Sequence, residues 1–326
     1  MKKILFLNPN SIVGSPAFER VKSFADFYKN KGIYVDYFDY PKNLLELVKM
    51  IFYIYKFEFD SVFVSQPPFK YLIIFYLPFV KKIIDYRDGW SIAINDGYGG
   101  LVKKNFIKAN IAKIIEYFVM KKSDLVITCT PGLYDYLSKF CSKEILMIPN
   151  GISEENFKLI KKASTSSKLN SKELKFYCAG KFSEYGVNRV KLVPDVIKKR
   201  YRNNIELHLI GCDINSNIWI KDYVDESFKI IFYPRMSKDD LYINLNHADF
   251  FLSIVRDEKY ELGTKIFEYI AFKKPVVNYF SEKNSFTAYF DGIFDVNFSN
   301  ESIFNKSIIR EILISEYADK LVLDLK

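Results

Sequence analysis

The sequence predicts an α/β protein built from two Rossmann-like, doubly wound domains. Short β-branched and aromatic runs alternate with longer helical patterns along the whole chain. The 326 residues are enough for two hydrophobic cores. Near the middle the alternation lapses into a polar stretch that includes Ala-Ser-Thr-Ser-Ser at 163–167. We therefore expect an N-terminal domain over 1–152, a linker over 153–173 and a C-terminal domain over 174–326, whose last helix can pack back on the N-terminal domain.

The first half contains six strand-like segments, which is enough for a complete Rossmann-like sheet. They are residues 3–7, 34–38, 61–64, 82–85, 125–128 and 145–148. The first connection begins as a helix should, because Ser15 can act as N-cap and Pro16 occupies the first helical position. Gly32 is expected to end that helix region.

The second half repeats the pattern with five strand-like segments. These are residues 175–178, 207–210, 229–232, 250–254 and 275–278, with helices expected over 188–201, 238–246 and 265–272. Ligands of doubly wound domains bind at the carboxyl ends of the strands. We therefore expect the functional site in a cleft where the carboxyl ends of the two sheets face each other.

Composition narrows the class of protein. A net charge of +9 with 17% aromatic residues suits an anionic partner, although a bias toward Lys, Ile, Phe and Tyr codons explains it equally well. The four isolated cysteines and two histidines offer little material for a zinc site and indicate a reducing cytosol. The most apolar segment, 71–80, is about half as long as a membrane-spanning helix must be. We expect a cytoplasmic protein without a transmembrane helix.

Several common motifs are absent from the sequence. Without G-x-G-x-x-G, a nicotinamide or flavin enzyme is disfavoured, and without G-x-x-x-x-G-K-[ST], so is a P-loop nucleotidase. The lysines are scattered and no nucleic-acid-reading motif occurs, so no nucleic-acid partner is expected. We interpret His208 and His247 as structural residues.

The most informative segment is YELGTKIFEYIAFKKPVV at 260–277. It opens with the turn Gly263-Thr264, and Thr264 is expected to cap a helix whose free N–H groups can hold a diphosphate. Lys265 and Glu268 lie three residues apart on one helix face, so they can contact the phosphates and the ribose of one nucleotide. The alternative is that Glu268 only complements the helix dipole and Lys265 only solvates the surface.

At these residues the sequence resembles the GT-B glycosyltransferases, specifically glycosyltransferase family 4. Members of that family often carry K-x-x-E-Y-[small apolar]-A-x-x-[KR]-P-V-V, which is matched by Lys265, Glu268, Tyr269, Ala271, Lys274, Pro275, Val276 and Val277. The resemblance implies that Glu268 binds the donor ribose. The family's first glutamate is replaced by Tyr260, and Glu258 and Glu261 lie out of register. Glu261 is kept as a candidate contact to the donor.

Three further segments follow the family's order along the chain. Asp85-Tyr86-Arg87-Asp88-Gly89-Trp90 looks like its D-x-R-D-x-W element, Pro149-Asn150-Gly151-Ile152 like its P-N-G-[IV] turn, and Ala179-Gly180-Lys181-Phe182 like its G-[RK] element. The resemblance implies that Gly180 and Lys181 face the donor diphosphate, although Tyr185 stands where a second cation is common. Lys181 can also be read as an ordinary surface lysine.

The resemblance also implies roles in the N-terminal domain. Arg87 and Asp88 become the catalytic candidates, with Asp88 orienting the acceptor or the donor sugar; the alternative is a structural ion pair between them. Gly14 and Ser15 lie in the loop after the first strand, where backbone amides of family members approach the donor or acceptor.

The implied function is a glycosyltransferase that moves a sugar from a nucleotide-diphosphate sugar to a glycan or lipid-linked acceptor. The resemblance further implies retention of configuration, no metal or other cofactor, and a place in cell-surface polysaccharide or glycoconjugate synthesis. One alternative is a catalytically inactive GT-B-like subunit that binds sugar nucleotides or an assembly partner, suggested by Tyr260 and Tyr185. A GT-B-fold epimerase is disfavoured because so few histidines are available as acid or base.

A basic amphipathic helix is expected over 101–122. It carries Val102, Phe106, Ile107, Ile111, Ile114, Ile115 and Phe118 beside Lys103, Lys104, Lys108, Lys113, Lys121 and Lys122. Such a helix can rest on the anionic lipid of the cytoplasmic membrane face. Alternatively, its apolar residues pack on the N-domain sheet and its lysines are simply solvated.

Overall fold

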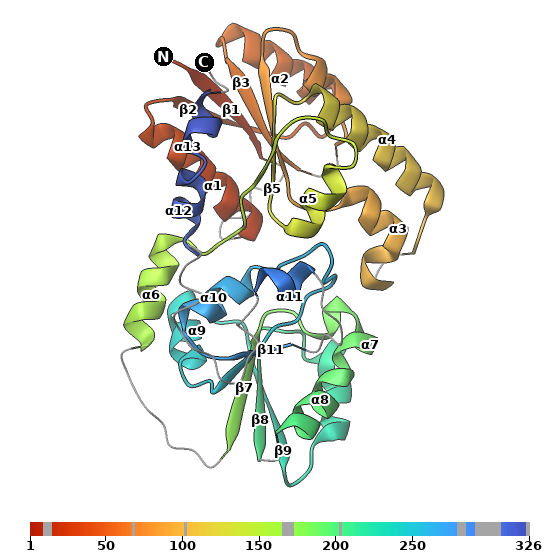
Figure 1. The fold of residues 1–326 in the computed structure, drawn as a ribbon, viewed down its shortest axis with the longest axis vertical. Coiled ribbons are helices and arrows are strands. Elements are labelled where there is room, and N and C mark those ends of the chain that lie inside the picture. Colours follow the sequence, from red (N-terminus) through yellow and green to blue (C-terminus); the bar gives the residue numbers. More distant parts are fainter. Residues whose placement is uncertain are drawn as a thin grey trace. The chain divides into compact units, whose positions relative to one another are not determined.

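A computed structural model describes residues 1–8, 15–66, 69–100, 103–164, 173–201, 204–278, 285–290 and 308–323 (Figure 1). The chain divides into two compact units. Unit 1 comprises Met1–Asp96, Lys104–Ser153 and Ile309–Lys326, and unit 2 comprises Gly97–Lys103 and Glu154–Ile308. The segment from Ile309 therefore belongs with the first half of the chain.

Unit 1 is built on a six-stranded parallel sheet with the order β2-β1-β3-β4-β5-β6. Its strands are β1 Lys3–Asn8, β2 Tyr34–Asp39, β3 Ser61–Gln66, β4 Lys81–Tyr86, β5 Leu125–Thr128 and β6 Ile145–Met147. Its helices are α1 Pro16–Asn30, α2 Leu44–Lys56, the 3-10 helix η1 Leu72–Tyr76, α3 Trp90–Gly100, α4 Phe106–Lys122, α5 Pro131–Leu137, α12 Arg310–Ser315 and α13 Ala318–Leu323.

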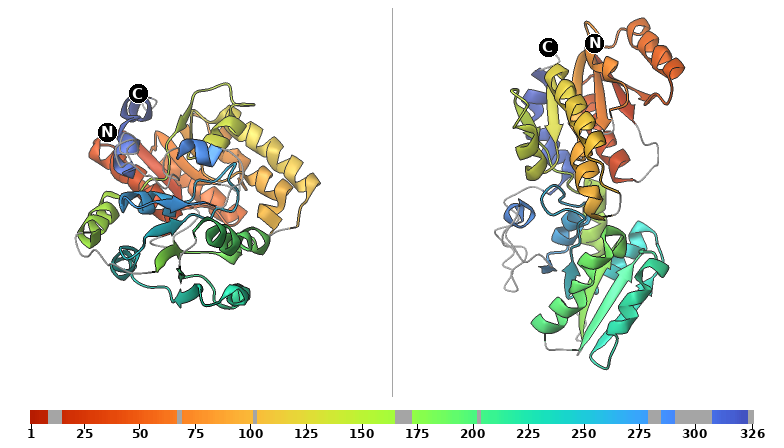
Figure 2. Two further views of the ribbon diagram at one scale, coloured as in Figure 1. Left: turned by 60° about the horizontal axis from the view of Figure 1, so that its bottom comes forward. Right: turned by 90° about the vertical axis from the view of Figure 1, so that its right-hand side faces the viewer.

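The helices of unit 1 cover both faces of the sheet. On one face, a core cluster joins Phe6 and Phe63 to Phe24 of α1, Leu313 of α12 and Leu321 of α13. Connections between parallel strands are right-handed, so α2, η1, α4 and α5, which all lead toward β6, cover the opposite face. Figure 2 (right) shows α2, α4 and α5 following one another across this unit.

Unit 2 is built on a five-stranded parallel sheet with the order β11-β10-β7-β8-β9. Its strands are β7 Leu174–Ala179, β8 Ile205–Ile210, β9 Phe228–Tyr233, β10 Phe250–Leu252 and β11 Val276–Val277. Its helices are α6 Glu154–Ser164, η2 Ser183–Tyr185, α7 Val187–Val190, α8 Leu192–Arg200, η3 Asn215–Tyr223, α9 Lys238–Leu245, α10 Lys265–Ala271 and α11 Ser285–Tyr289. Two parallel sheets with alternating helices confirm the predicted α/β class.

Three expected elements differ from the structure. Part of the expected linker forms α6, because acidic residues in its first turn and lysines in its last turn complement the helix dipole, and Ile160 is buried. The single helix expected over 188–201 is broken at Lys191 into α7 and α8. The helix expected over 101–122 begins only at Phe106, where the Asn105 side chain accepts a hydrogen bond from the Lys108 N–H (2.9 Å).

Candidate functional site

A small pocket lies at the carboxyl ends of β7 and β10 in unit 2. Its volume is about 40 Å³, and its lining includes Lys181, Tyr185, Gly263, Thr264 and Lys265. Two segments that are far apart in sequence, the G-[RK] element and the start of α10, thus meet at one place. The pocket is too small to enclose a nucleotide, so a diphosphate would lie across its mouth.

The loop after β7 is fixed by its backbone. Gly180 has a φ of +102°, a conformation that residues with a side chain rarely adopt, and its N–H donates to the Ile210 carbonyl (2.8 Å). The Glu184 carboxylate accepts hydrogen bonds from the N–H groups of Phe182 (2.9 Å) and Asp213 (3.2 Å). Lys181 is exposed, and among the described residues no carboxylate pairs with it. The loop therefore presents Lys181 as an available cation.

The start of α10 differs in one respect from expectation. Thr264 does occupy the N-cap position, but its φ of −92° and ψ of −29° are helical and its side chain makes no capping hydrogen bond. The predicted N-cap position of Thr264 is therefore confirmed, but its side chain caps none of the first N–H groups of α10, because a side-chain cap needs an extended backbone to reach the second or third N–H. Gly263 turns the chain into the helix with a φ of +68°.

Lys265 and Glu268 form an ion pair across one turn of α10. The Lys265 Nζ lies 2.9 Å from Glu268 Oε2 and 3.1 Å from Oε1. The lysine side chain is 37% exposed and that of the glutamate only 14%. Without a ligand, each of the two proposed nucleotide contacts thus neutralises the other.

Two residues of the matched segment have structural roles that the sequence did not reveal. The Tyr269 hydroxyl accepts a hydrogen bond from the Ala179 N–H (2.8 Å), and its ring stacks on Phe251 of β10 (4.4 Å between centroids). Tyr269 therefore ties α10 to both strands that end at the pocket. Lys274 donates to the carbonyls of Asn246 and Ala248 at the end of α9, which explains a cation before Pro275.

Glu261, the remaining donor-side candidate, forms an ion pair with Arg256. It does not line the pocket, although Leu262 beside it does. The structure therefore brings Lys181, Gly263, Thr264 and Lys265 together at the pocket. Gly180 precedes Lys181 in the same loop, Glu268 is attached to the group through its ion pair with Lys265, and Glu261 is paired with Arg256 instead.

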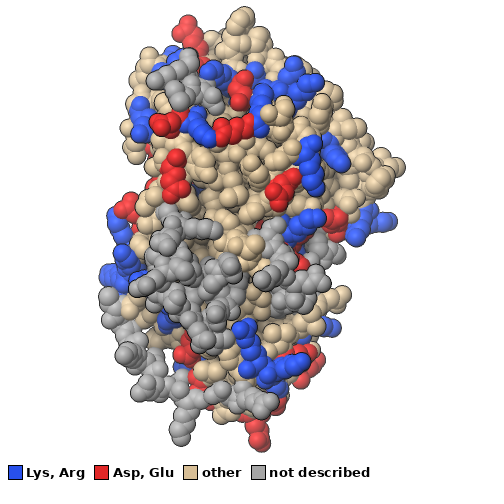
Figure 3. All heavy atoms as spheres, in the orientation of Figure 1, with Lys and Arg blue, Asp and Glu red and all other residues tan. Residues whose placement is uncertain are grey.

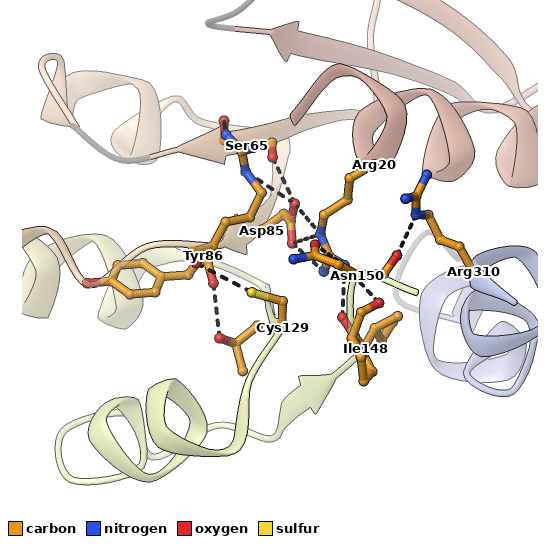
Figure 4. A network of polar contacts seen from close by, with 11 residues as sticks. Arg20, Ser65, Asp85, Tyr86, Cys129, Ile148, Asn150 and Arg310 are labelled. Carbon is orange, nitrogen blue, oxygen red and sulfur yellow. Dashed lines mark hydrogen bonds and ion pairs between the residues drawn. The ribbon is translucent and has the colours of Figure 1, made fainter. Parts of the chain in front are cut away.

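In unit 1, the carboxyl end of β4 is held by a buried ion pair that the sequence did not reveal (Figure 4). The Arg20 guanidinium, 0% exposed, binds both carboxylate oxygens of Asp85 (2.8–3.1 Å) and donates to the Ile148 carbonyl (2.9 Å). The Ser65 hydroxyl donates to the same carboxylate (2.8 Å). Because both charges are paired and hydrogen-bonded, α1, β3, β4 and the end of β6 are locked together.

The turn at 149–152 is clamped from two sides. Arg20 donates to the Pro149 carbonyl (3.2 Å), while the Arg310 side chain donates to the carbonyls of Asn150 and Gly151. The Arg310 N–H adds a hydrogen bond to the Ile152 carbonyl (2.8 Å). Two buried arginines therefore fix the P-N-G-I turn.

The catalytic candidates Arg87 and Asp88 follow β4. The Arg87 Nε lies 4.0 Å from Asp85 and makes no hydrogen bond although it is buried, while the Arg87 carbonyl accepts one from the Cys129 thiol (3.4 Å). Burial raises the pKa of Cys129 to about 12, so it stays a protonated donor. Asp88 is exposed, and among the described residues it pairs with no cation. The alternative of an Arg87–Asp88 ion pair is therefore wrong.

A second buried carboxylate supports the same loop. Glu116 of α4 is 0% exposed and accepts hydrogen bonds from the hydroxyls of Tyr86, Ser91 (2.6 Å) and Tyr136 (2.8 Å), and from the Ser91 N–H (3.0 Å). Burial and this carboxylate raise the pKa of Tyr86 well above its usual value, so the phenol remains a donor. Glu116 therefore holds both ends of the segment that carries Arg87 and Asp88.

The remaining candidates are placed as follows. The Ser15 hydroxyl accepts a hydrogen bond from the Phe18 N–H (3.2 Å), which confirms its role as the N-cap of α1. Gly14 lies outside the described residues. Within the described ranges, no three His, Cys, Asp or Glu side chains are arranged to hold a metal ion, and none of the helices is both long and apolar enough to span a membrane. Independence of metals stays a prediction.

Comparison with known proteins shows the fold. No protein-family model and no curated protein matches the sequence. An α-glucosyltransferase solved with UDP and DNA has a TM-score of 0.54 at 13% identity, covering 99% of this chain and 92% of its own. The catalytic domain of starch synthase IV from Arabidopsis thaliana, bound to ADP and acarbose, has a TM-score of 0.51 at 10% identity (100% and 95% coverage). A UDP-GlcNAc 2-epimerase from Methanocaldococcus jannaschii has a TM-score of 0.50 at 12% identity (98% and 99%). The chain thus has the GT-B fold.

Proposed function

We propose that the protein is a glycosyltransferase that moves a sugar from a nucleotide-diphosphate sugar to a glycan or lipid-linked acceptor. The observation that carries the proposal is the pocket of unit 2, where Lys181 meets the turn and helix start at 263–265. The family resemblance assigns Lys181 to the donor diphosphate, and the N–H groups at the start of α10 are the second group that suits it. Cations and uncapped N–H groups suit an anion there.

The Lys265–Glu268 pair gives the donor site a ligand-dependent step. A diphosphate across the pocket attracts Lys265, which is the more exposed partner. When Lys265 moves from Glu268 to the diphosphate, the Glu268 carboxylate becomes free to accept hydrogen bonds from the ribose hydroxyls. Lys181, Lys265 and the N–H groups of α10 then offset the negative charge that develops on the leaving diphosphate.

In unit 1, Asp88 is the group best suited to orient a sugar hydroxyl. Its carboxylate is exposed and carries no partner in the described part of the chain, while Asp85 and Glu116 fix the backbone on either side. A fixed loop restricts the orientation of a bound sugar hydroxyl, which lowers the entropic cost of the transfer. Arg87 supplies positive charge beside it.

Transfer is favoured over epimerisation, although both kinds of enzyme share the fold. An epimerase needs an acid and a base at the reacting carbon. His208 is 4% exposed and stacks on Tyr177 (4.1 Å between centroids), and burial lowers its pKa to about 4. This histidine is therefore enclosed by the sheet of unit 2 rather than presented to a substrate.

Several finer features remain part of the proposal. Retention of the sugar's configuration, independence of metals, cytoplasmic location and a place in cell-surface polysaccharide or glycoconjugate synthesis follow from the family resemblance. In the proposed reaction the leaving phosphate accepts the acceptor's proton, and Lys181 and Lys265, which both line the pocket, offset the negative charge that develops on the diphosphate.

The first experiment is a thermal-shift screen with nucleoside diphosphates and their sugars, followed by assays of transfer and donor hydrolysis with and without EDTA. A stabilising ligand raises the melting temperature because it binds only the folded protein. We expect a nucleotide sugar to stabilise the protein and to be turned over without added metal. Binding without turnover supports the inactive-subunit alternative, and no binding by any nucleotide contradicts both.

A further inference from the structure

The helix face of unit 1 opposite α1 exposes many large apolar side chains. On α4, the buried residues are Ala109, Ala112, Glu116, Val119 and Met120. Exposed on the outer side are Phe106 (72%), Ile107 (73%), Ile111 (54%), Ile114 (57%), Tyr117 (40%) and Phe118 (38%). The expectation that the apolar residues of this helix pack on the sheet is therefore wrong, and another surface must cover them if they are to leave water.

Helix α2 repeats this arrangement. Leu47, Met50 and Ile54 are buried, whereas Leu44 (69%), Leu45 (64%), Val48 (57%) and Phe52 (65%) are exposed on the opposite side. Residues 44, 48 and 52 follow one another at intervals of four, so they form one stripe. Two helices on the same face of unit 1 thus turn their bulkiest apolar residues outward.

The turn at Pro78–Phe79 adds the most exposed aromatic residue. Phe79 is 97% exposed and has a φ of +61°, a conformation that is strained for a bulky side chain. The Tyr55 hydroxyl of α2 donates to the Pro78 carbonyl (3.0 Å) and so holds the turn. Strain that the surroundings maintain in an exposed residue points to a functional role.

These elements form one surface, which we call the outer face: the exposed apolar residues of α2, η1, the Phe79 turn and α4. The right-handed connections place α2, η1 and α4 side by side over the sheet. Lys122 of α4 lies over the ring of Tyr76 of η1 (5.0 Å), and the hydrogen bond from Tyr55 joins α2 to the Phe79 turn.

The charge of the outer face identifies its partner. Helices α2 and α4 carry six lysines, whereas of their two glutamates Glu116 is buried and Glu46 is half-buried. Lys56 lies over Phe52 (5.8 Å) and Lys121 over Tyr117 (5.8 Å). Figure 3 shows Lys and Arg side chains, interspersed with Asp and Glu, among broad uncharged areas in the part of the molecule where unit 1 is drawn. Apolar residues flanked by lysines fit the boundary between acyl chains and anionic headgroups.

We propose that the outer face docks the protein on a bilayer that contains anionic lipid, with Phe79 and the outward residues of α2 and α4 entering the headgroup boundary. This deepens the proposed function, because it assigns the acceptor to the lipid-borne class, and only that assignment rests on the proposed function. The lysines bind lipid phosphates, so the attachment weakens as salt screens the surface potential.

The test is sedimentation with vesicles of phosphatidylcholine alone and of phosphatidylcholine mixed with phosphatidylglycerol. We expect binding to the anionic vesicles at low salt and release at high salt. Phe79→Asn removes the aromatic ring at a position whose backbone asparagine tolerates, and should weaken partitioning about 10-fold. Lys108→Glu with Lys121→Glu should abolish the preference for anionic vesicles. Ile312→Ser, at an exposed site on α12, is the matched control and should change nothing.

Two further measurements distinguish lipid from a protein partner or a second copy of this chain on the outer face. With Phe79→Trp, brominated lipids should quench the new fluorescence, which a protein partner or a second copy would not cause. Sedimentation velocity without lipid should show an unchanged size for Phe79→Asn. No vesicle binding, or self-association that Phe79→Asn abolishes, overturns the proposal. Nucleotide stabilisation is measured on the same variants and should be unaltered, so failure of docking is distinguishable from failure of the donor site.

Discussion

The two units use charge in opposite ways at the carboxyl ends of their sheets. In unit 1, Asp85 and Glu116 are fully buried and their hydrogen-bonding capacity is filled by Arg20, serine and tyrosine side chains. In unit 2, Lys181 is exposed and Lys265 is 37% exposed, beside a backbone turn at Gly263. The buried charges of unit 1 therefore fix a loop, whereas the two lysines of unit 2 are accessible to a ligand.

The largest expected effect comes from breaking the buried ion pair of unit 1. Asp85→Asn leaves the Arg20 guanidinium buried without a countercharge, which should cost about 3–5 kcal/mol of unfolding free energy. Urea denaturation measures this loss. Asp88→Asn changes an exposed carboxylate three residues away and should alter stability by less than about 0.5 kcal/mol. Equal losses of unfolding free energy in Asp85→Asn and Asp88→Asn would contradict the conclusion that Asp85 fixes the loop and Asp88 does not.

The next effect concerns the donor side of unit 2. Glu268→Ala should remove paired hydrogen bonds to the donor ribose and lower kcat/KM about 30- to 150-fold, or about 2–3 kcal/mol. Stability should change little, because the Lys265 partner is 37% exposed and becomes solvated. Steady-state kinetics on a variant with unchanged circular dichroism provides the measurement. A kcat/KM close to that of the unchanged protein would contradict ribose binding by Glu268 and favour the alternative that it only complements the helix dipole.

Lys181 offers a smaller, charge-specific test. Lys181→Ala should weaken donor binding and transfer about 10-fold through loss of one charge-assisted hydrogen bond, whereas Lys181→Arg should retain most activity. Calorimetric titration with the nucleoside diphosphate found in the screen measures the binding part. Lys221→Ala, at an exposed lysine of η3, serves as the control for net charge. If Lys181→Ala and Lys221→Ala bind the diphosphate equally well, the assignment of Lys181 to the donor site is wrong.

The smallest effect is a pH dependence of stability that arises in unit 2. Burial lowers the pKa of His208 to about 4, while in the unfolded chain it is about 6.5. As the pH falls through that interval, the unfolded chain takes up a proton that the folded protein does not. Unfolding free energy should therefore fall by about 1–2 kcal/mol between pH 7 and pH 5. His208→Gln should remove this part of the pH dependence in denaturation curves, and an unchanged slope would speak against a buried neutral histidine.

The strands were predictable from the sequence because buried parallel strands form continuous apolar runs. The segment 125–128 has no polar alternation to obscure it. In 205–210, Glu206 and His208 alternate with apolar residues, and the prediction covered only 207–210. The break between α7 and α8 at Lys191 did have a sequence signal, which the prediction of one helix over 188–201 overlooked: Pro194 lacks an N–H and fits only the first turn of a helix, so a new helix begins just before it. Helix α6 was missed although Phe157 and Ile160 lie three residues apart between an acidic first turn and a basic last turn, which is a helical pattern; the polar composition of the segment favoured the interpretation as a linker.

The meeting of Lys181 with Gly263, Thr264 and Lys265 at one pocket agrees with the sequence prediction, whereas the buried charges of unit 1 were not predicted. Arg20 and Asp85 lie in separate elements, and no local pattern marks them as partners. Glu116 stands in a lysine-rich helix, where a glutamate is usually solvated, yet it is completely buried. On α4, small residues such as Ala109 and Ala112 face the sheet and the large ones face outward, which reverses the usual rule for amphipathic helices.

The place of α12 and α13 has a consequence for how the protein is made. Their residues Leu313, Ile314 and Leu321 belong to the core of unit 1, and Arg310 holds its 149–152 turn. A ribosome therefore synthesises the whole of residues 154–308 before it reaches the segment that completes the earlier unit. During that time, the part of the unit 1 core on the α1 side that α12 and α13 will cover stays exposed in the nascent chain. Chaperones that recognise exposed apolar surface would meet the nascent chain at this stage, and slower translation of 154–308 would lengthen the exposure.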